Sequence, residues 1–192
     1  MSFKECGPLA GLVGTCESEW TGLDVAYHDD KGKIAETPFR VKTTFTAFGP
    51  VANGDQSPYG LDCRTAASTK GEGHPFHTEV GFRMSDAQRR QVVRCFMMPR
   101  ASTLVAGGTA EPDAATFELE SVLGSNTYGI LANKYLDEIV NTTRFDVTIT
   151  IEGDRCPYDE TTVVEQQKYP AIILRTDRNT LTRTSWEAYA NV

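Results

Sequence analysis

The chain has 192 residues, 40% of them hydrophobic, and a formal net charge of −7. This length is usual for one domain with a sizeable core. An acidic protein whose cations do not cluster repels phosphate backbones, so we expect no nucleic-acid partner. The first residues lack the features of a secretory signal, and no apolar run is long enough for a membrane helix. We therefore expect a soluble, cytoplasmic protein with no membrane partner.

The cysteines and histidines do not form a metal-binding pattern. Five cysteines are an odd number, and none of them forms a CxxC pair. This usage favours free thiols in a reducing compartment and argues against a structural zinc site. The three histidines, His28, His74 and His77, also lack a metal-site spacing. We expect no metal.

Strand-like runs dominate the chain from residue 39 onward. Each run is rich in β-branched and aromatic residues, and most run starts are 10 to 20 residues apart, with turn residues between them. This spacing indicates an all-β sandwich or an antiparallel up-and-down barrel. The expected strands are residues 39–48, 59–67, 75–84, 92–98, 103–106, 116–122, 145–151, 160–165, 171–176 and 181–184.

Three segments depart from the strand pattern. Residues 8–13 (PLAGLV) predict a single helical turn that plugs one end of a barrel. Residues 126–143 carry apolar residues three to five positions apart, which predicts a short amphipathic helix or a capping loop. Residues 27–38 are polar and predict a loop.

His77 and Glu79 are the candidate catalytic residues. They are two positions apart on an expected strand, so they share one face of it, while Phe76, Val80 and Phe82 share the other. A histidine beside a carboxylate can serve as a general acid or base. The same pair would be ordinary surface charge if this face were solvated, and the sequence leaves both interpretations open.

Several further residues are candidate ligand contacts. Arg83 lies on the strand of His77, and Arg94 and Arg100 fall on another strand and at its end. Arginines that converge inside a barrel bind a carboxylate or phosphate in a bidentate manner, whereas on the outside they are surface charge. Trp20 is either a pocket wall or a core residue that closes the barrel. Met97 offers an adaptable apolar wall.

Five segments resemble one known family. They are GPLAGLVGT (7–15), FHTEVGF (76–82), LVAGG (104–108), YDETTVV (158–164) and RTDRNTL (175–181). Together they resemble the nitrobindin-like haem-binding β-barrel family, which is related in shape to fatty-acid-binding proteins. The resemblance extends over about residues 7–183 and points to a longer, uncharacterised branch.

The resemblance implies a roughly ten-stranded antiparallel barrel with a short capping helix, so we expect one barrel domain over residues 1–192. In nitrobindins the pocket holds haem through one histidine, and Arg175 stands where the resemblance would place it. Arginine offers iron no lone pair, so we expect no cofactor. Tyr169 and Cys156 are residue types that can bind iron, although neither matches the ligand position. Arg175 and Tyr169 complete the expected ligand contacts.

The sequence thus favours a barrel that binds a small, partly apolar and anionic molecule, with aromatic acids among the candidates. A first alternative is a cofactor-independent lyase, isomerase or decarboxylase for a small aromatic acid, with His77 and Glu79 as acid and base. A haem-binding peroxynitrite isomerase and a lipid carrier are the remaining alternatives. The sequence is also compatible with a homodimer.

Overall fold

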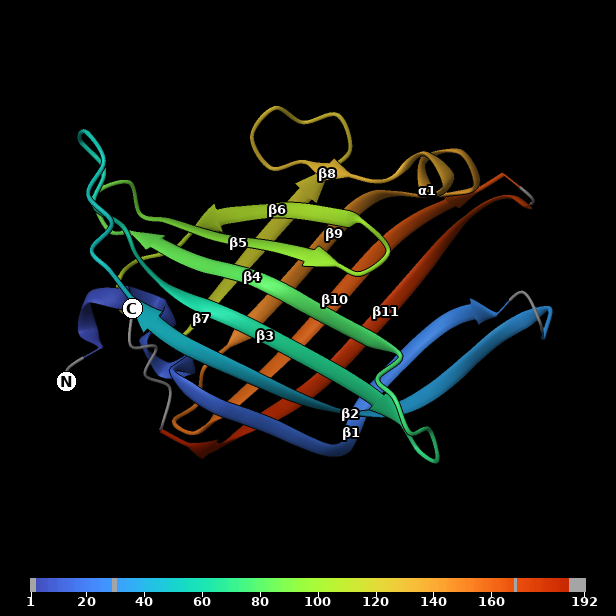
Figure 1. The fold of residues 1–192 in the computed structure, drawn as a ribbon, viewed down its shortest axis with the longest axis horizontal. Helices are drawn as coiled ribbons and strands as arrows, with labels where there is room; N and C mark the ends of the chain where they lie inside the picture. Colours follow the sequence, from blue (N-terminus) through green and yellow to red (C-terminus); the bar gives the residue numbers. More distant parts are fainter. Residues whose placement is uncertain (1–2, 29–30, 168, 187–192) are drawn as a thin grey trace.

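The computed structural model describes residues 3–28, 31–167 and 169–186, without the side chains of residues 169–171. It consists of eleven antiparallel strands and two short helices (Figure 1). The helices are η1 (Lys4–Leu12, 3₁₀) and α1 (Lys134–Ile139). The strands are β1 (Gly14–His28), β2 (Lys33–Phe48), β3 (Tyr59–Thr69), β4 (His77–Asp86), β5 (Gln91–Met98), β6 (Ser102–Thr109), β7 (Thr116–Val122), β8 (Ile130–Leu131), β9 (Val140–Thr150), β10 (Arg155–Gln166) and β11 (Tyr169–Ser185).

Ten of these strands close into a barrel. Consecutive strands pair with each other except at β8, where β7 pairs directly with β9. Because β1 also pairs with β11, the sheet returns to itself. The short strand β8 adds to β6 as an eleventh member. Closure leaves few backbone groups unpaired and encloses a lumen. The expectation of an all-β, roughly ten-stranded up-and-down barrel is confirmed.

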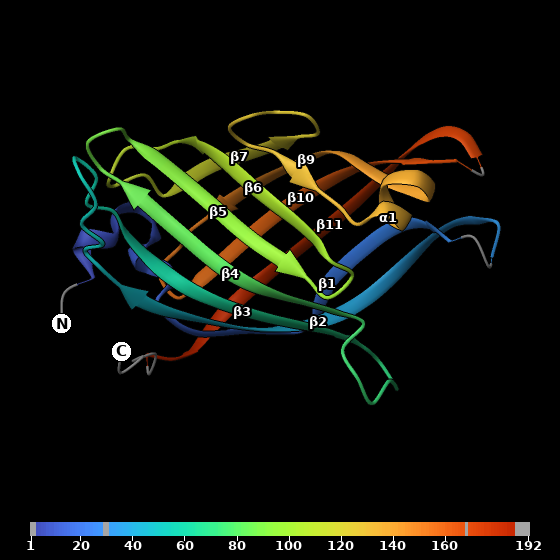
Figure 2. The same cartoon turned by 45° about the horizontal axis from the view of Figure 1, so that its top comes forward.

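The two helices lie at opposite ends of the barrel (Figures 1 and 2). The helix η1 buries Leu9 and Leu12 and closes one end. Arg183 on β11 ties this plug in place, because its guanidinium donates to the backbone oxygens of Gly11 at 2.6 Å and Val13 at 3.1 Å. The predicted plugging turn at residues 8–13 is therefore present, within a longer 3₁₀ segment.

At the other end, α1 is held by its N-cap. The Asn133 side-chain oxygen accepts a bond from the Leu136 N–H at 3.0 Å, and the amide nitrogen of Asn133 donates to the backbone oxygen of Arg100. These bonds anchor the helix to the turn between β5 and β6. Only Lys134–Ile139 of the expected segment 126–143 is helical. Among the described residues, no helix is long and apolar enough to cross a membrane.

The sequence patterns miss most of β1 and misassign residues 27–38. The predicted loop is wrong, because β1 extends to His28, β2 begins at Lys33, and the two strands pair up to these residues in a long hairpin (Figure 1). The inward side of β1 carries Cys16, Ser18, Gly22 and Asp24, all small or polar, so no hydrophobic alternation marks the strand. The last two expected runs form one continuous strand, β11.

Candidate functional site

The lumen holds a cavity of about 440 Å³. Strands β2 to β6 and β9 to β11 line its wall, Leu12 of η1 lies at the plugged end, and Leu136 of α1 lies at the other end, which we call the mouth. Apolar walls such as Phe45, Phe96 and Phe145 alternate with charged side chains. Ligand sites commonly combine apolar walls with a few convergent polar groups in this way.

The inward face of β4 is polar. His77, Glu79 and Arg83 all line the cavity, whereas Val80 and Phe82 face outward, with Phe82 48% exposed. The alternation of β4 is therefore inverted relative to an ordinary half-buried strand, because its polar side faces the lumen. The two catalytic candidates lie inside the barrel. His77 Nε2 and Glu79 Oε1 are 3.0 Å apart.

A charged network crosses the middle of the lumen. The Arg94 guanidinium on β5 donates to Glu79 on β4 at 2.8 Å and to Glu160 on β10 at 3.0 Å. It also lies 4.2 Å from the ring centre of Phe96. Arg94 is buried, so these two carboxylates supply the counter-charge that its burial demands.

This network sets the protonation of Glu79. Burial raises the pKa of Glu79, but the Arg94 charge and the hydrogen bond from His77 outweigh it and lower the pKa to about 2. Glu79 is therefore a carboxylate at neutral pH and a poor proton acceptor. Of the two catalytic candidates, His77 is the one that can take up a proton, with Glu79 orienting its ring.

Arg83 occupies the inner part of the cavity and has no acidic partner among the described residues. It lies opposite Arg94 in the β4–β5 register, and Arg94 already holds both nearby carboxylates. The Nη1 atom of Arg83 is buried without a hydrogen-bond partner. Its other neighbours include the Phe45 ring, 5.3 Å from the guanidinium carbon, and the thiols of Cys63 and Cys156, whose pKa values burial raises to about 11. None of these groups neutralises the cation.

Arg175 and Arg100 also line the cavity but differ in their surroundings. Arg175 Nε donates to Asp24 at 2.7 Å, so its charge is compensated by the protein itself. Arg100 is exposed at the mouth, beside the turn that α1 covers. The three arginines expected to bind an anion therefore separate into one with an acidic partner, one at the rim, and Arg83.

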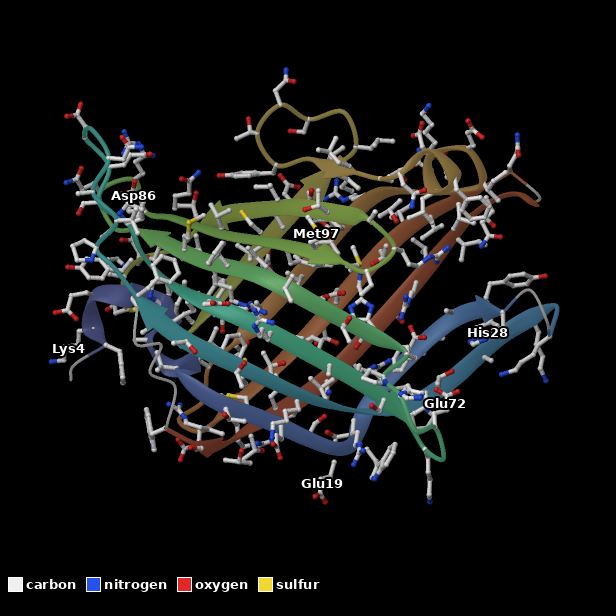
Figure 3. The ribbon with its side chains drawn as sticks, in the orientation of Figure 1. Lys4, Glu19, His28, Glu72, Asp86 and Met97 are labelled. Atoms are coloured by element: carbon white, nitrogen blue, oxygen red, sulfur yellow. The ribbon has the colours of Figure 1, made fainter. Side chains whose placement is uncertain are left out.

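Two expected ligand contacts lie elsewhere. Trp20 is 41% exposed at a bulge of β1, with φ of 59°, and Met97 is 54% exposed on the outer face of β5. Figure 3 shows Met97 on β5 and Glu19 on β1 pointing away from the barrel. Neither Trp20 nor Met97 lines the cavity, so the structure does not bring these two residues to the candidate site. The side chain of Tyr169 lies outside the described part of the chain.

The sequence analysis did not single out three acidic residues at the site: Glu160 and Asp177, which line the cavity, and Asp24, which is bonded to the lining residue Arg175. Arg94 shares its strand face with Val92, Phe96 and Met98, and an arginine within an apolar face is a signal of a charged lumen. Asp24, by contrast, gives no such signal, because its inward neighbours on β1 are small or polar.

Comparison with known families gives one match that spans nearly the whole chain. A family model described as "THAP4-like, heme-binding beta-barrel domain" matches residues 5–183. The chain belongs to this family. The nitrobindin-like resemblance of the sequence segments is thereby confirmed.

The fold of this chain is also found in a solved structure. The protein Rv2717c from M. tuberculosis superposes with a TM-score of 0.58 at 18% identity, covering 92% of this chain and 94% of that chain. An S-type phycobiliprotein lyase, CPES from Guillardia theta, gives a TM-score of 0.43 at 12% identity, covering 95% and 93%. No curated protein matches the chain.

The residues of this THAP4-like barrel do not fit an iron-bound haem. Arg175, at the position where the resemblance implies a histidine ligand, offers no lone pair and is bonded to Asp24. His77 is the single histidine among the described lining residues, and its Nε2 is engaged by Glu79 at 3.0 Å.

Proposed function

We propose that this barrel binds a small, partly apolar organic anion and holds its charged group with Arg83. The observation that carries the proposal is that half-buried Arg83 lines the cavity and its Nη1 atom is buried without a hydrogen-bond partner. A buried cation without a partner is costly, and like charges opposite each other on neighbouring strands are destabilising. A carboxylate, sulfonate or phenolate would relieve both costs.

The position of Arg83 sets the orientation of the ligand. His77 and Arg83 are six residues apart on β4, which corresponds to about 20 Å along the strand. His77 is near the mouth, and Arg83 is nearer to the plug formed by η1. We infer that the anionic group enters first and that the apolar body packs against the Phe96 and Phe145 rings, which contact each other edge to face, beside the Arg94 network. This arrangement supports a non-haem ligand for this member of the family.

Two dyes of the same shape test the proposal. Anilinonaphthalene sulfonate is an aromatic anion, and N-phenylnaphthylamine is its uncharged counterpart. We expect R83M to weaken binding of the sulfonate dye about 10- to 100-fold and to leave the uncharged dye nearly unchanged. The control is R64M, which removes the same charge from an exposed position on β3. Equal loss of both dyes, or no difference between R83M and R64M, would contradict the proposal.

A second candidate function is acid–base catalysis without a cofactor on a small aromatic acid. The observation that favours it is the His77–Glu79 hydrogen bond inside the cavity, which orients an imidazole toward bound molecules. We propose testing p-hydroxycinnamate and related acids for decarboxylation or isomerisation by absorbance and carbon dioxide release. Turnover that is abolished by H77A and retained in R64M supports this activity. Binding without turnover leaves the protein a carrier.

A further inference from the structure

Asp177 lies in the middle of β11 and lines the cavity. Its Oδ1 atom is buried, and no described group forms a hydrogen bond with it. The anion-binding role proposed above does not use this carboxyl group. An unpartnered polar atom at a cavity wall is a candidate contact for a ligand.

Carboxyl groups flank Asp177 on both sides. In the sheet register Asp177 is opposite Asp24 on β1 and opposite Glu160 on β10, and opposite residues share one face of a sheet. Both flanking carboxylates have cations of their own: Arg175 donates to Asp24 at 2.7 Å, and Arg94 donates to Glu160 at 3.0 Å. Among the residues that the structure describes, no cation bonds directly to Asp177, unlike the other two members of this row.

The charges around Asp177 favour its neutral form. Burial raises its pKa first, the charges of Glu160, Asp24 and Glu79 raise it further, and Arg175 opposes them, giving a pKa of about 8. Tyr158, diagonal to Asp177 on β10, also lines the cavity, and burial holds its pKa well above the usual value. At neutral pH both groups therefore carry an O–H, and both can donate.

We propose that Asp177 is a second ligand-binding residue, which donates a hydrogen bond from its carboxylic acid to a carbonyl oxygen of the molecule in the cavity. This inference rests on the proposed function and deepens it. The ligand class becomes an aromatic or unsaturated carbonyl compound that also bears an anionic group for Arg83. A carboxylate at this position would accept hydrogen bonds only and would repel a carbonyl oxygen.

The dye Prodan tests the proposal, because it is an uncharged aromatic ketone whose emission moves to longer wavelength when its carbonyl accepts a hydrogen bond. In the wild-type protein we expect the long-wavelength emission below pH 8 and its loss above, with a midpoint near pH 8. D177N keeps a donor without a titrating proton, so its emission should stay at long wavelength throughout. D177A should emit at short wavelength at every pH. D159N, on the outer face of β10, should behave like the wild type.

Emission that is the same in the wild type and D177A, or a titration that persists in D177N, overturns the inference. Absence of Prodan binding also overturns it. If D177A does not fold, the comparison of the wild type with D177N across pH decides the question. The sulfonate dye separates the two proposals. If its binding depends on Arg83 but the emission of Prodan does not depend on Asp177, only this inference fails. Loss of the Arg83 dependence means that the proposed function fails.

Discussion

Arg94 and Glu160 meet across the lumen of the barrel, with their side-chain atoms 3.0 Å apart. Their strands are not neighbours, because β6, β7 and β9 separate β5 from β10 on the shorter way around the barrel. The ion pair therefore ties two opposite walls together. A ligand that enters at the mouth must pass beside it to reach Arg83.

Removal of Arg94 should destabilise the protein strongly. R94M leaves Glu79 and Glu160 buried without their cation, and breaking a buried ion pair from one side costs about 3–5 kcal/mol. Urea denaturation should show this loss for R94M and almost none for the exposed R64M. The triple replacement E79Q/R94M/E160Q, which removes all three charges, should recover most of the stability. A stability of R94M equal to that of R64M would show that the bridge contributes little.

Protonation of Glu79 at low pH should destabilise the folded protein. Its pKa falls from 4.5 to about 2 in the folded protein, so its contribution is present above the unfolded pKa and is lost as pH falls toward the folded one. Thermal unfolding between about pH 2 and pH 5 should therefore show a decreasing midpoint. E79Q should be less stable at neutral pH, and its unfolding midpoint should fall less steeply with decreasing pH. If the unfolding midpoints of the wild type and E79Q fall in parallel with pH, Glu79 is not the source of the acid dependence.

Asp177 should give stability the opposite pH dependence, with a loss as pH rises. Its pKa rises from 3.8 to about 8 on folding, so the stability it contributes is full below the unfolded pKa and is lost as pH rises through the folded one. D177N removes this titration. The variant should therefore gain stability relative to the wild type as pH increases from about 4 to 9. The measurement is the difference in urea midpoints across this range, and a constant difference would contradict the raised pKa.

The barrel was predictable because most strands carry β-branched and aromatic residues at regular spacing. The run at residues 116–122 coincides with β7. The strand β1 was not predictable by the same reasoning, since its inward residues are small or polar and a bulge interrupts it between Ser18 and Gly22. Hydrophobic alternation reports burial in an apolar core, and this lumen is partly charged.

The site was predictable only where residues share one strand. His77, Glu79 and Arg83 follow from alternation on β4, but alternation does not say which face is inside. The pairing of Arg94 with Glu160 depends on barrel closure, which brings together residues 66 positions apart. The sequence also cannot show that Arg175 forms an ion pair with Asp24, 151 positions away.

The last prediction concerns haem. We expect the wild-type protein to lose added haem to apomyoglobin, because Arg175 has no lone pair and His77 is bonded to Glu79. R175H supplies an imidazole at the position implied by the family resemblance, and the pair D24N/R175H also removes the carboxylate that would hold that imidazole. Both variants should retain a Soret band better than the wild type, with the double variant retaining it best.

The control for added histidine is R178H, which places the same residue at an exposed position of β11. It should behave like the wild type. A wild-type Soret band that survives apomyoglobin at one haem per chain would contradict the prediction, and H77A would then identify the ligand. Loss of that band in H77A would mean that His77 leaves Glu79 to bind iron. Retention would place the ligand elsewhere in the cavity, where Tyr158, Cys156 and Met98 are among the lining residues whose side chains can bind iron.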